Sequence, residues 1–229
     1  MTALSPEQLT QAWSYGRRVA PTQALAQFTW LVTGSSGGLA CNGIGMLPAA
    51  ADTRLYHPDG EEIPLARCSE IAADRVLTYM HIRQLRVASA SDAPPWISLL
   101  IAALRLGVIA QMLDISYAHL DKRTSFGQKT TRHQLVKASF AAIFGEVTQL
   151  RSQLGLRVAQ NDYLELEQEH MAITLLAGQA EKLMGGHGYL LGNTHTLSHF
   201  SMMMYCAFGK TGTDISQADE DNPSWKSNS

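Results

Sequence analysis

Arg123-Thr124-Ser125-Phe126-Gly127 ends one long apolar segment of this chain, and Gly185-Gly186-His187-Gly188-Tyr189 ends another. The three glycines of the second stretch expose backbone N–H groups and let a large ligand approach the main chain. The guanidinium of Arg123 is a planar fork of donors that suits a phosphate group. Together the two stretches predict a shared site for a cofactor that carries phosphate.

Composition limits the partners of such a site. The chain has 229 residues, of which 45% are hydrophobic, so it can bury one sizeable core. Its formal net charge of −2 provides no basic field for a nucleic acid. Residues 1–25 lack the pattern of a signal peptide, so we expect a cytoplasmic protein. The three cysteines stand in no metal-ligand spacing, and we expect free thiols at Cys41, Cys68 and Cys206.

Hydrophobic periodicity predicts an α+β chain that is mainly α. In the C-terminal half, apolar residues recur at intervals of three and four, which indicates amphipathic helices. Their short connections make neighbouring helices antiparallel, so an antiparallel four-helix bundle follows. We expect an N-terminal helix within 1–29, a small β region over 30–92, the bundle over 93–212 and a disordered tail over 213–229. The bundle helices are expected at 96–123, 131–154, 162–184 and 196–208.

The N-terminal part of the chain changes from a helical pattern to β-type runs at about residue 30. Ser5 and Pro6 form a helix-start signal, and we expect one helix over 5–27. Glycines and prolines punctuate the stretch that follows, where short runs rich in β-formers predict four or five strands. These runs are residues 39–46, 53–56, 63–66 and 76–87.

Pro94–Leu113 is long and apolar enough to cross a bilayer, with Arg105 as its single charge. That charge falls near the centre of the segment, where lipid makes it costly. Polar residues follow at once. The pattern therefore favours a buried helix over a membrane span.

Three other patterns receive structural rather than functional interpretations. The glycine-rich Val32–Ala40 is similar to the cofactor turn of short-chain dehydrogenases, but no Tyr-x-x-x-Lys occurs, so we expect a flexible loop. One Glu-x-x-His, at Glu167 and His170, is half of a di-iron pattern and is expected on a solvated helix face. His195 and His199 precede a methionine run that is typical of core packing. We predict no metal site.

The spacing around the two opening stretches carries a family resemblance. Arg123, Phe126, Gly127 and Gln134 are followed downstream by the glycine-rich stretch, in a fixed order. In this order residues 97–213 resemble the C-terminal helical domain of the acyl-CoA dehydrogenases, FAD enzymes that desaturate acyl thioesters. The family's loops touch FAD bound mainly to a neighbouring subunit. The resemblance implies Arg123 on the pyrophosphate, Phe126 and Gln134 along the cofactor, and Gly185, Gly186 and Gly188 beside its adenosine half.

The chain departs from that family in two respects. Desaturation needs a carboxylate that removes the α-proton. The positions where the family places its glutamate are occupied by Gly209 or Thr211 near the end of the bundle, and by Ile97 on its first helix. The N-terminal helical domain of the family is missing, and residues 30–90 resemble a shortened form of its middle β domain. We therefore expect no catalytic residue in this chain.

Two interpretations follow. In the first, the chain is a subunit that shares FAD across an interface with a homologous partner, which supplies the catalytic glutamate for an acyl thioester substrate. In the second, it is a non-catalytic subunit that reuses the bundle for dimerisation, since a bundle face needs no flavin.

Overall fold

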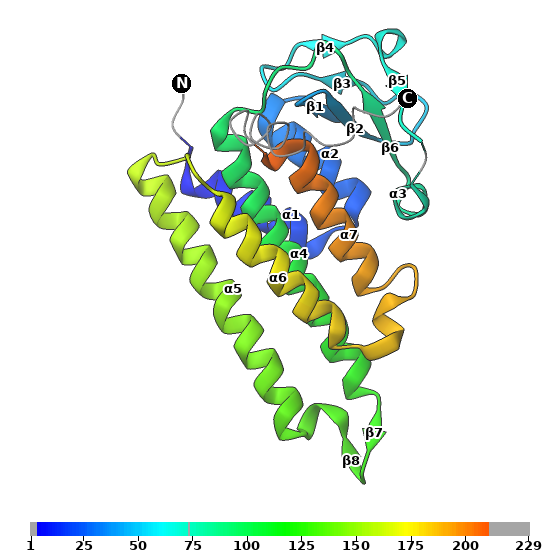
Figure 1. Cartoon of the computed structure of the whole chain (residues 1–229), viewed down its shortest axis with the longest axis vertical. Coiled ribbons are helices and arrows are strands. Elements are labelled where there is room, and N and C mark those ends of the chain that lie inside the picture. The colour runs from blue at the N-terminus through cyan, green and yellow to red at the C-terminus, as the bar shows by residue number, and fades with distance from the viewer. Residues whose placement is uncertain (1–3, 73, 211–229) are drawn as a thin grey trace, which may run out of the picture.

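The computed structural model describes residues 4–72 and 74–210 of the chain (Figure 1). It is mainly helical, with a sheet at one end of a set of long helices, as the sequence predicts. Thr211, Gly212 and the predicted tail over 213–229 lie outside the described residues.

The N-terminal segment forms two helices, α1 (Pro6–Arg18) and α2 (Pro21–Thr33), so the prediction of one helix over 5–27 is wrong. The start of α1 is as expected: Ser5 and Gln8 make a reciprocal capping box. The break falls before Pro21, which lacks an N–H and takes the first position of a new helix. Because α2 extends to Thr33, the β region begins later than residue 30.

The sheet has six short strands in the order β4-β3-β1-β2-β6-β5. All neighbours are antiparallel except β1 and β3. The strands are β1 (Gly38–Cys41), β2 (Ile44–Pro48), β3 (Leu55–Tyr56), β4 (Glu62–Ile63), β5 (Ser69–Glu70) and β6 (Ile82–Arg86), with the short helix η1 (Leu65–Arg67) between β4 and β5.

Two predicted strands divide differently in the structure. The run over 39–46 is a hairpin, because Asn42 and Gly43 both adopt positive φ and turn the chain. The run over 76–87 holds a short helix, α3 (Arg75–Tyr79), before β6. Asp74 starts this helix by accepting hydrogen bonds from the backbone of Val76 and Leu77. Strand propensity in that run was therefore overridden by a cap.

The second half of the chain builds the bundle around one central helix. Helix α4 (Pro95–Asp121) contacts α5 (Gln134–Gln160), α6 (Glu167–Lys182), α7 (Thr194–Met204) and also α1. Of its most apolar window, 89% is buried inside the protein, which is the environment of a core helix, although its length and composition would allow a membrane span. Short helices join or extend the long ones: η2 (Thr130–Arg132), η3 (Gly185–Tyr189) and the π-helical η4 (Tyr205–Gly209).

Helix α1 is part of the bundle and not a separate element. Gly16 of α1 lies against the backbone of Leu104, and Gly107 of α4 lies against the backbone of Trp13. A Cβ at either glycine would overlap a carbonyl oxygen of the other helix. The two backbones are therefore in direct contact, and only glycine permits it.

One side chain ties the sheet to the end of the bundle. Asn42, at the turn between β1 and β2, donates from Nδ2 to the carbonyl oxygens of Ala207 (3.3 Å) and Lys210 (3.0 Å). Its Oδ1 accepts from the backbone N–H of Ala93 at 2.8 Å, just before α4. The amide thus fixes both ends of the bundle that face the sheet.

Candidate functional site

The Arg123–Gly127 stretch contributes to a projecting hairpin between α4 and α5. Strands β7 (Thr124–Ser125) and β8 (Gln128–Lys129) pair antiparallel, and Phe126 and Gly127 make the turn with φ of 49° and 78°. Two consecutive positive φ values are typical of a type I′ turn. The side chain of Phe126 is 99% exposed. Figure 1 shows this hairpin at the opposite end of the molecule from the six-stranded sheet.

Polar contacts hold the hairpin in place. Asp121 accepts from Lys129 Nζ at 2.7 Å and from Thr131 Oγ1 at 3.0 Å, and these two hydrogen bonds lower the pKa of its carboxyl group. His133 Nε2 lies 2.9 Å from Ser125 Oγ, and its ring meets that of Phe126 edge-on at 6.1 Å. The hairpin is thus held at its base, while Phe126 at its tip stays almost fully exposed.

The glycine-rich stretch forms η3, in the connection from α6 to α7. Gly188 is buried, and a Cβ there would lie 2.6 Å from Thr194 Oγ1 and 2.7 Å from the carbonyl oxygen of Glu181. Gly185 has φ of +58°, which favours glycine. Gly186 differs from both, because its φ is ordinary and a Cβ there would meet no atom within 4 Å. Close packing explains the glycine at 188, and the positive φ explains the glycine at 185. Neither reason applies to Gly186.

The structure brings the two stretches together through a pair of histidines that the sequence analysis missed. The rings of His119 and His187 stack with centroids 4.5 Å apart and planes 15° from parallel. Arg123 Nη1 lies 3.3 Å from His119 Nε2. Partial burial lowers the pKa of His119, and the neighbouring basic groups lower it further. The available signal was spacing: His119 precedes Arg123 by one helical turn, and His187 lies inside the glycine stretch.

The remaining predicted cofactor residue, Gln134, is the first residue of α5 and is exposed beside the hairpin. Among the described residues of this end of the bundle, contacts through His119 and His187 therefore link Arg123 to the turn at Gly185–Gly188. Phe126 and Gln134 stand on the adjoining exposed surface without a contact to the glycine turn. The arrangement is a basic, glycine-lined surface next to an exposed aromatic ring.

Two of the three positions that would carry the catalytic base, Gly209 and Ile97, lie at the other end of α4. Gly209 and Ile97 are buried. The carbonyl oxygen of Gly209 accepts from Ser98 Oγ at 2.6 Å, and a Cβ on Gly209 would lie 2.6 Å from Cδ2 of Tyr205. The third position, Thr211, is outside the described residues. No space is left for a carboxylate at Gly209.

A buried polar network fills this region. Arg105, 1% exposed, donates from Nη1 to His170 Nδ1 (2.9 Å), from Nη2 to Thr174 Oγ1 (2.6 Å) and from Nε to Ser201 Oγ (3.1 Å). Its guanidinium also lies over the ring of Tyr205, 4.9 Å from the centroid. Burial lowers its pKa to about 10. Among the described residues no carboxylate pairs with this charge.

The network determines which nitrogen of His170 carries the proton. Ser98 donates to Gly209, so its oxygen accepts from His170 Nε2 at 3.0 Å. His170 Nδ1 is then the unprotonated nitrogen that accepts from Arg105. Burial and the neighbouring Arg105 lower the pKa of His170 to about 3, so the ring is neutral. The prediction of a solvated face is right for Glu167, which is exposed, and wrong for His170, which is 1% exposed.

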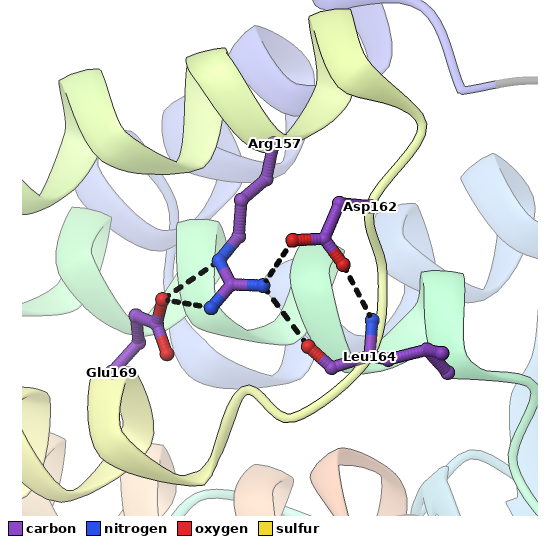
Figure 2. Close-up of polar contacts among 4 residues, drawn as sticks. All are labelled: Arg157, Asp162, Leu164 and Glu169. Carbon is purple, nitrogen blue, oxygen red and sulfur yellow. Dashed lines mark hydrogen bonds and ion pairs between the residues drawn. The ribbon is translucent and has the colours of Figure 1, made fainter.

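A groove lies between α5 and α6. The side chain of Arg157 binds Glu169 and Asp162, each at 2.7 Å, and donates to the carbonyl oxygen of Leu164 at 3.0 Å (Figure 2). This cluster connects the end of α5 to the start of α6 and borders a groove of roughly 410 Å³. The groove is lined by Leu150, Gln153, Leu156, Arg157, Gln168, Glu169 and Ala172. Its charged residues are paired with each other, so its walls offer mainly apolar contact.

The two histidines of the methionine-rich helix make separate contacts. His195 lies 2.7 Å from Glu181, and His199 lies 3.2 Å from Asp74. Within residues 4–72 and 74–210, no three side chains of His, Cys, Asp or Glu gather as metal ligands would.

No protein-family model and no curated protein sequence matches this chain. Solved structures do match it. An acyl-CoA dehydrogenase from Slackia heliotrinireducens DSM 20476 superposes with a TM-score of 0.51 at 14% identity, covering 96% of this chain and 78% of that one. A glutaryl-coenzyme A dehydrogenase in complex with glutaryl-CoA gives 0.51 at 14%, covering 80% of this chain and 61% of that one.

This chain has the acyl-CoA dehydrogenase fold. A third match, PigA in complex with FAD, has a TM-score of 0.58 at 13% identity and covers 93% of this chain and 82% of that one. In each case the other protein is longer than the part this chain covers. The resemblance inferred from Arg123–Gly127 and Gly185–Tyr189 is confirmed at the level of fold.

Within the acyl-CoA dehydrogenase fold, the exposed end of the bundle fits a phosphate-bearing group. Arg123, His119 and His187 provide donors within a few ångströms of one another. The open space at Gly186 leaves its backbone accessible to another molecule. These features suit an anion brought by another molecule.

Proposed function

We propose that this chain is an acyl-CoA dehydrogenase-like subunit that completes an FAD site of a homologous partner. The observation that supports it most is the contrast between the two ends of α4: one carries an exposed basic turn, and the other a filled region where no described carboxylate pairs with Arg105. FAD, when bound, accepts the hydride of α,β-desaturation. The partner supplies the glutamate, and the substrate is an acyl thioester.

In this proposal the residues of this chain bind and orient FAD. Arg123 holds the pyrophosphate with its fork of donors, and Gly185, Gly186 and Gly188 present the backbone of η3 to the adenosine half. Phe126 and Gln134 lie along the cofactor. The 99% exposure of Phe126 is consistent with insertion into a partner, because a fully exposed aromatic ring gains free energy only when another surface covers it.

The missing base limits what the chain does alone. Gly209 and Ile97 are both buried and neither side chain is a carboxylate, so this chain contributes no proton acceptor at those positions. A short β region and two N-terminal helices also give little cover against water, which a reduced flavin requires. The proposal therefore places desaturation in the assembled complex.

The visible spectrum tests this proposal. The chain purified alone is expected to be colourless, and the chain co-purified with a full-length homologue from the same source is expected to show flavin absorbance near stoichiometry. Arg123→Ala should lower the flavin content of the complex about tenfold, the cost of one charge-assisted contact, while Arg151→Ala should not change it. Stoichiometric flavin that acyl-CoA reduces in the isolated chain would overturn the need for a partner.

A different observation favours the non-catalytic interpretation. Helices α5 and α6 carry apolar side chains that are each more than half exposed: Leu135, Phe144, Leu156, Met171 and Leu175. Exposed apolar side chains are typical of an interface, and Leu156 also lines the groove beside Arg157. In this interpretation these two helices pair with a second copy of the chain. Leu175→Glu would then convert a dimer to a monomer in analytical ultracentrifugation, whereas Glu146→Gln, on the exposed surface of α5, would not.

A further inference from the structure

The turn at the exposed end of α4 gathers basic side chains, and no ion pair joins them to an acid within residues 4–72 and 74–210. His119 and Arg123 come from the last turn of α4 and its C-terminal flank, and His187 comes from η3. Lys122 adds a fourth basic group near His119. Two acids close to this turn in the sequence are engaged elsewhere: Asp121 binds Lys129 and Thr131, and Glu181 binds His195. Like charges gathered in this way repel one another unless an anion joins them.

The existing contacts show how the turn reduces that repulsion in the absence of an anion. Arg123 is always protonated, so its Nη1 is the donor and His119 Nε2 is the acceptor at 3.3 Å. His119 is therefore neutral, with its proton on Nδ1. The parallel stacking of His187 at 4.5 Å also favours neutral rings, because two imidazolium ions at that distance would repel. The lowered pKa of His119 agrees with this geometry.

An anion would reverse this arrangement. A phosphate oxygen accepts hydrogen bonds and offers none, so it competes with His119 Nε2 for Arg123. Once Arg123 is drawn to the anion, His119 Nε2 becomes free to take a proton and donate to the same anion. His187 lies next to Gly186, whose open backbone is the second unexplained feature of the turn.

We propose that His119 and His187 are phosphate-binding residues, and that capture of a pyrophosphate diester at this turn takes up a proton onto the histidine pair. This inference rests on the proposed function, because it concerns the same turn. The proton comes from solvent and ends on a ring nitrogen of His119 or His187. Binding is therefore tighter at lower pH.

The shared ligand chemistry is the pyrophosphate diester, which FAD and dephospho-coenzyme A both carry with constant charge near neutral pH. The full chain is titrated from pH 5 to pH 8.5 while NMR follows the histidine C2–H signals, with and without millimolar FAD. Saturation is expected to raise the midpoints of His119 and His187, and the affinity for FAD should be about tenfold higher at pH 5.5 than at pH 8, one factor of ten per unit change of pKa.

Matched variants and ligands separate the causes. His119→Gln and His187→Gln assign the signals, and the double variant should bind FAD with no pH dependence; His57→Gln, in a turn of the β region, should leave the dependence intact. Riboflavin, which lacks phosphate, should move neither midpoint. A larger effect with FAD than with dephospho-coenzyme A assigns the turn to the cofactor, and the reverse assigns it to the thioester carrier.

Two results would overturn the inference: midpoints unchanged by millimolar FAD and by dephospho-coenzyme A, or a double variant that keeps the pH dependence of the native chain. Failure of the proposed function looks different. In that case no complex with a homologue retains flavin, while the histidine midpoints still respond to the diester.

Discussion

Helix α4 carries one polar cluster in its first half and another at its last turn, and the two have opposite environments. Arg105 and Ser98 are buried, and their donors reach His170, Thr174, Ser201 and Gly209 inside the chain. Arg123 is exposed and His119 is half-buried, and they contact each other and His187. A cluster that completes itself contributes to folding, whereas a cluster left open is available to a second molecule. The predictions below test this division, starting with the largest expected effect.

Acid should destabilise the chain through His170. The unfolded chain protonates this ring below about pH 6.5, whereas the folded chain holds it neutral because its pKa is lowered to about 3. Stability is therefore complete above pH 6.5 and falls as the pH drops towards 3, by up to about 5 kcal/mol at roughly 1.4 kcal/mol per pH unit. Urea denaturation at pH 4, 5, 6 and 7 measures this slope. His170→Gln should flatten it, and equal slopes in the two proteins would refute the assignment.

Removing the buried guanidinium should cost about 3 kcal/mol of folding free energy, from the cavity and the lost hydrogen bonds. The test is Arg105→Ala in chemical denaturation. The control is Arg151→Ala, whose guanidinium stacks on the ring of Trp13 at 4.7 Å on the exposed face of α5. That contact is worth about 0.5 to 1 kcal/mol. Similar losses in the two variants would show that the network of Arg105 is not special.

Two glycines of η3 should respond differently to the same substitution. Gly188→Ala should destabilise the chain by about 2 kcal/mol, because the added Cβ would press on Thr194 and on the backbone at Glu181. Gly186→Ala should change stability by less than about 0.5 kcal/mol, since its Cβ meets nothing. The thermal midpoint reports both. Flavin content of the complex should fall in Gly186→Ala despite its intact fold, and unchanged content would count against a ligand at this backbone.

The smallest effect on folding is expected at the hairpin tip. Phe126→Ala removes a ring that is 99% exposed, so the free energy of unfolding should stay within about 0.5 kcal/mol of the native value. Association with the homologous partner should weaken about tenfold or more, since covering an aromatic ring contributes well over 1 kcal/mol. Isothermal titration calorimetry of the two chains measures it. Loss of stability without loss of association would reverse the assignment.

Sequence reasoning located the open cluster better than the closed one. Arg123, Phe126 and the glycines stand at loop positions where spacing alone identifies them, and their order was sufficient to predict the fold. The partners of Arg105 come from α6 and α7, far along the chain, so no local pattern reveals them. His170 looked solvated because its neighbours Glu167 and Glu169 are charged, but helical rotation turns it inward.

The errors in the N-terminal half also have physical causes. Pro21 divided a periodic apolar segment that would otherwise continue as one helix. Asp74 capped a short helix in a run of residues with strand propensity. The participation of α1 in the bundle depends on Gly16 and Gly107, whose reciprocal contact cannot be inferred from either residue alone. Glycine in a helix is ordinarily a weak position, and only the facing backbone explains it.

The contact between Gly16 and Gly107 also closes a long loop of the chain. Helices α1 and α4 touch backbone to backbone, and the whole six-stranded sheet lies between them in the sequence. In topological terms the sheet is an insertion whose two ends are clamped by the bundle. The entropy of closing such a loop grows only with the logarithm of its length, about 0.6 kcal/mol for each doubling. The sheet can therefore be lengthened or shortened at little entropic cost to the helices that close the loop.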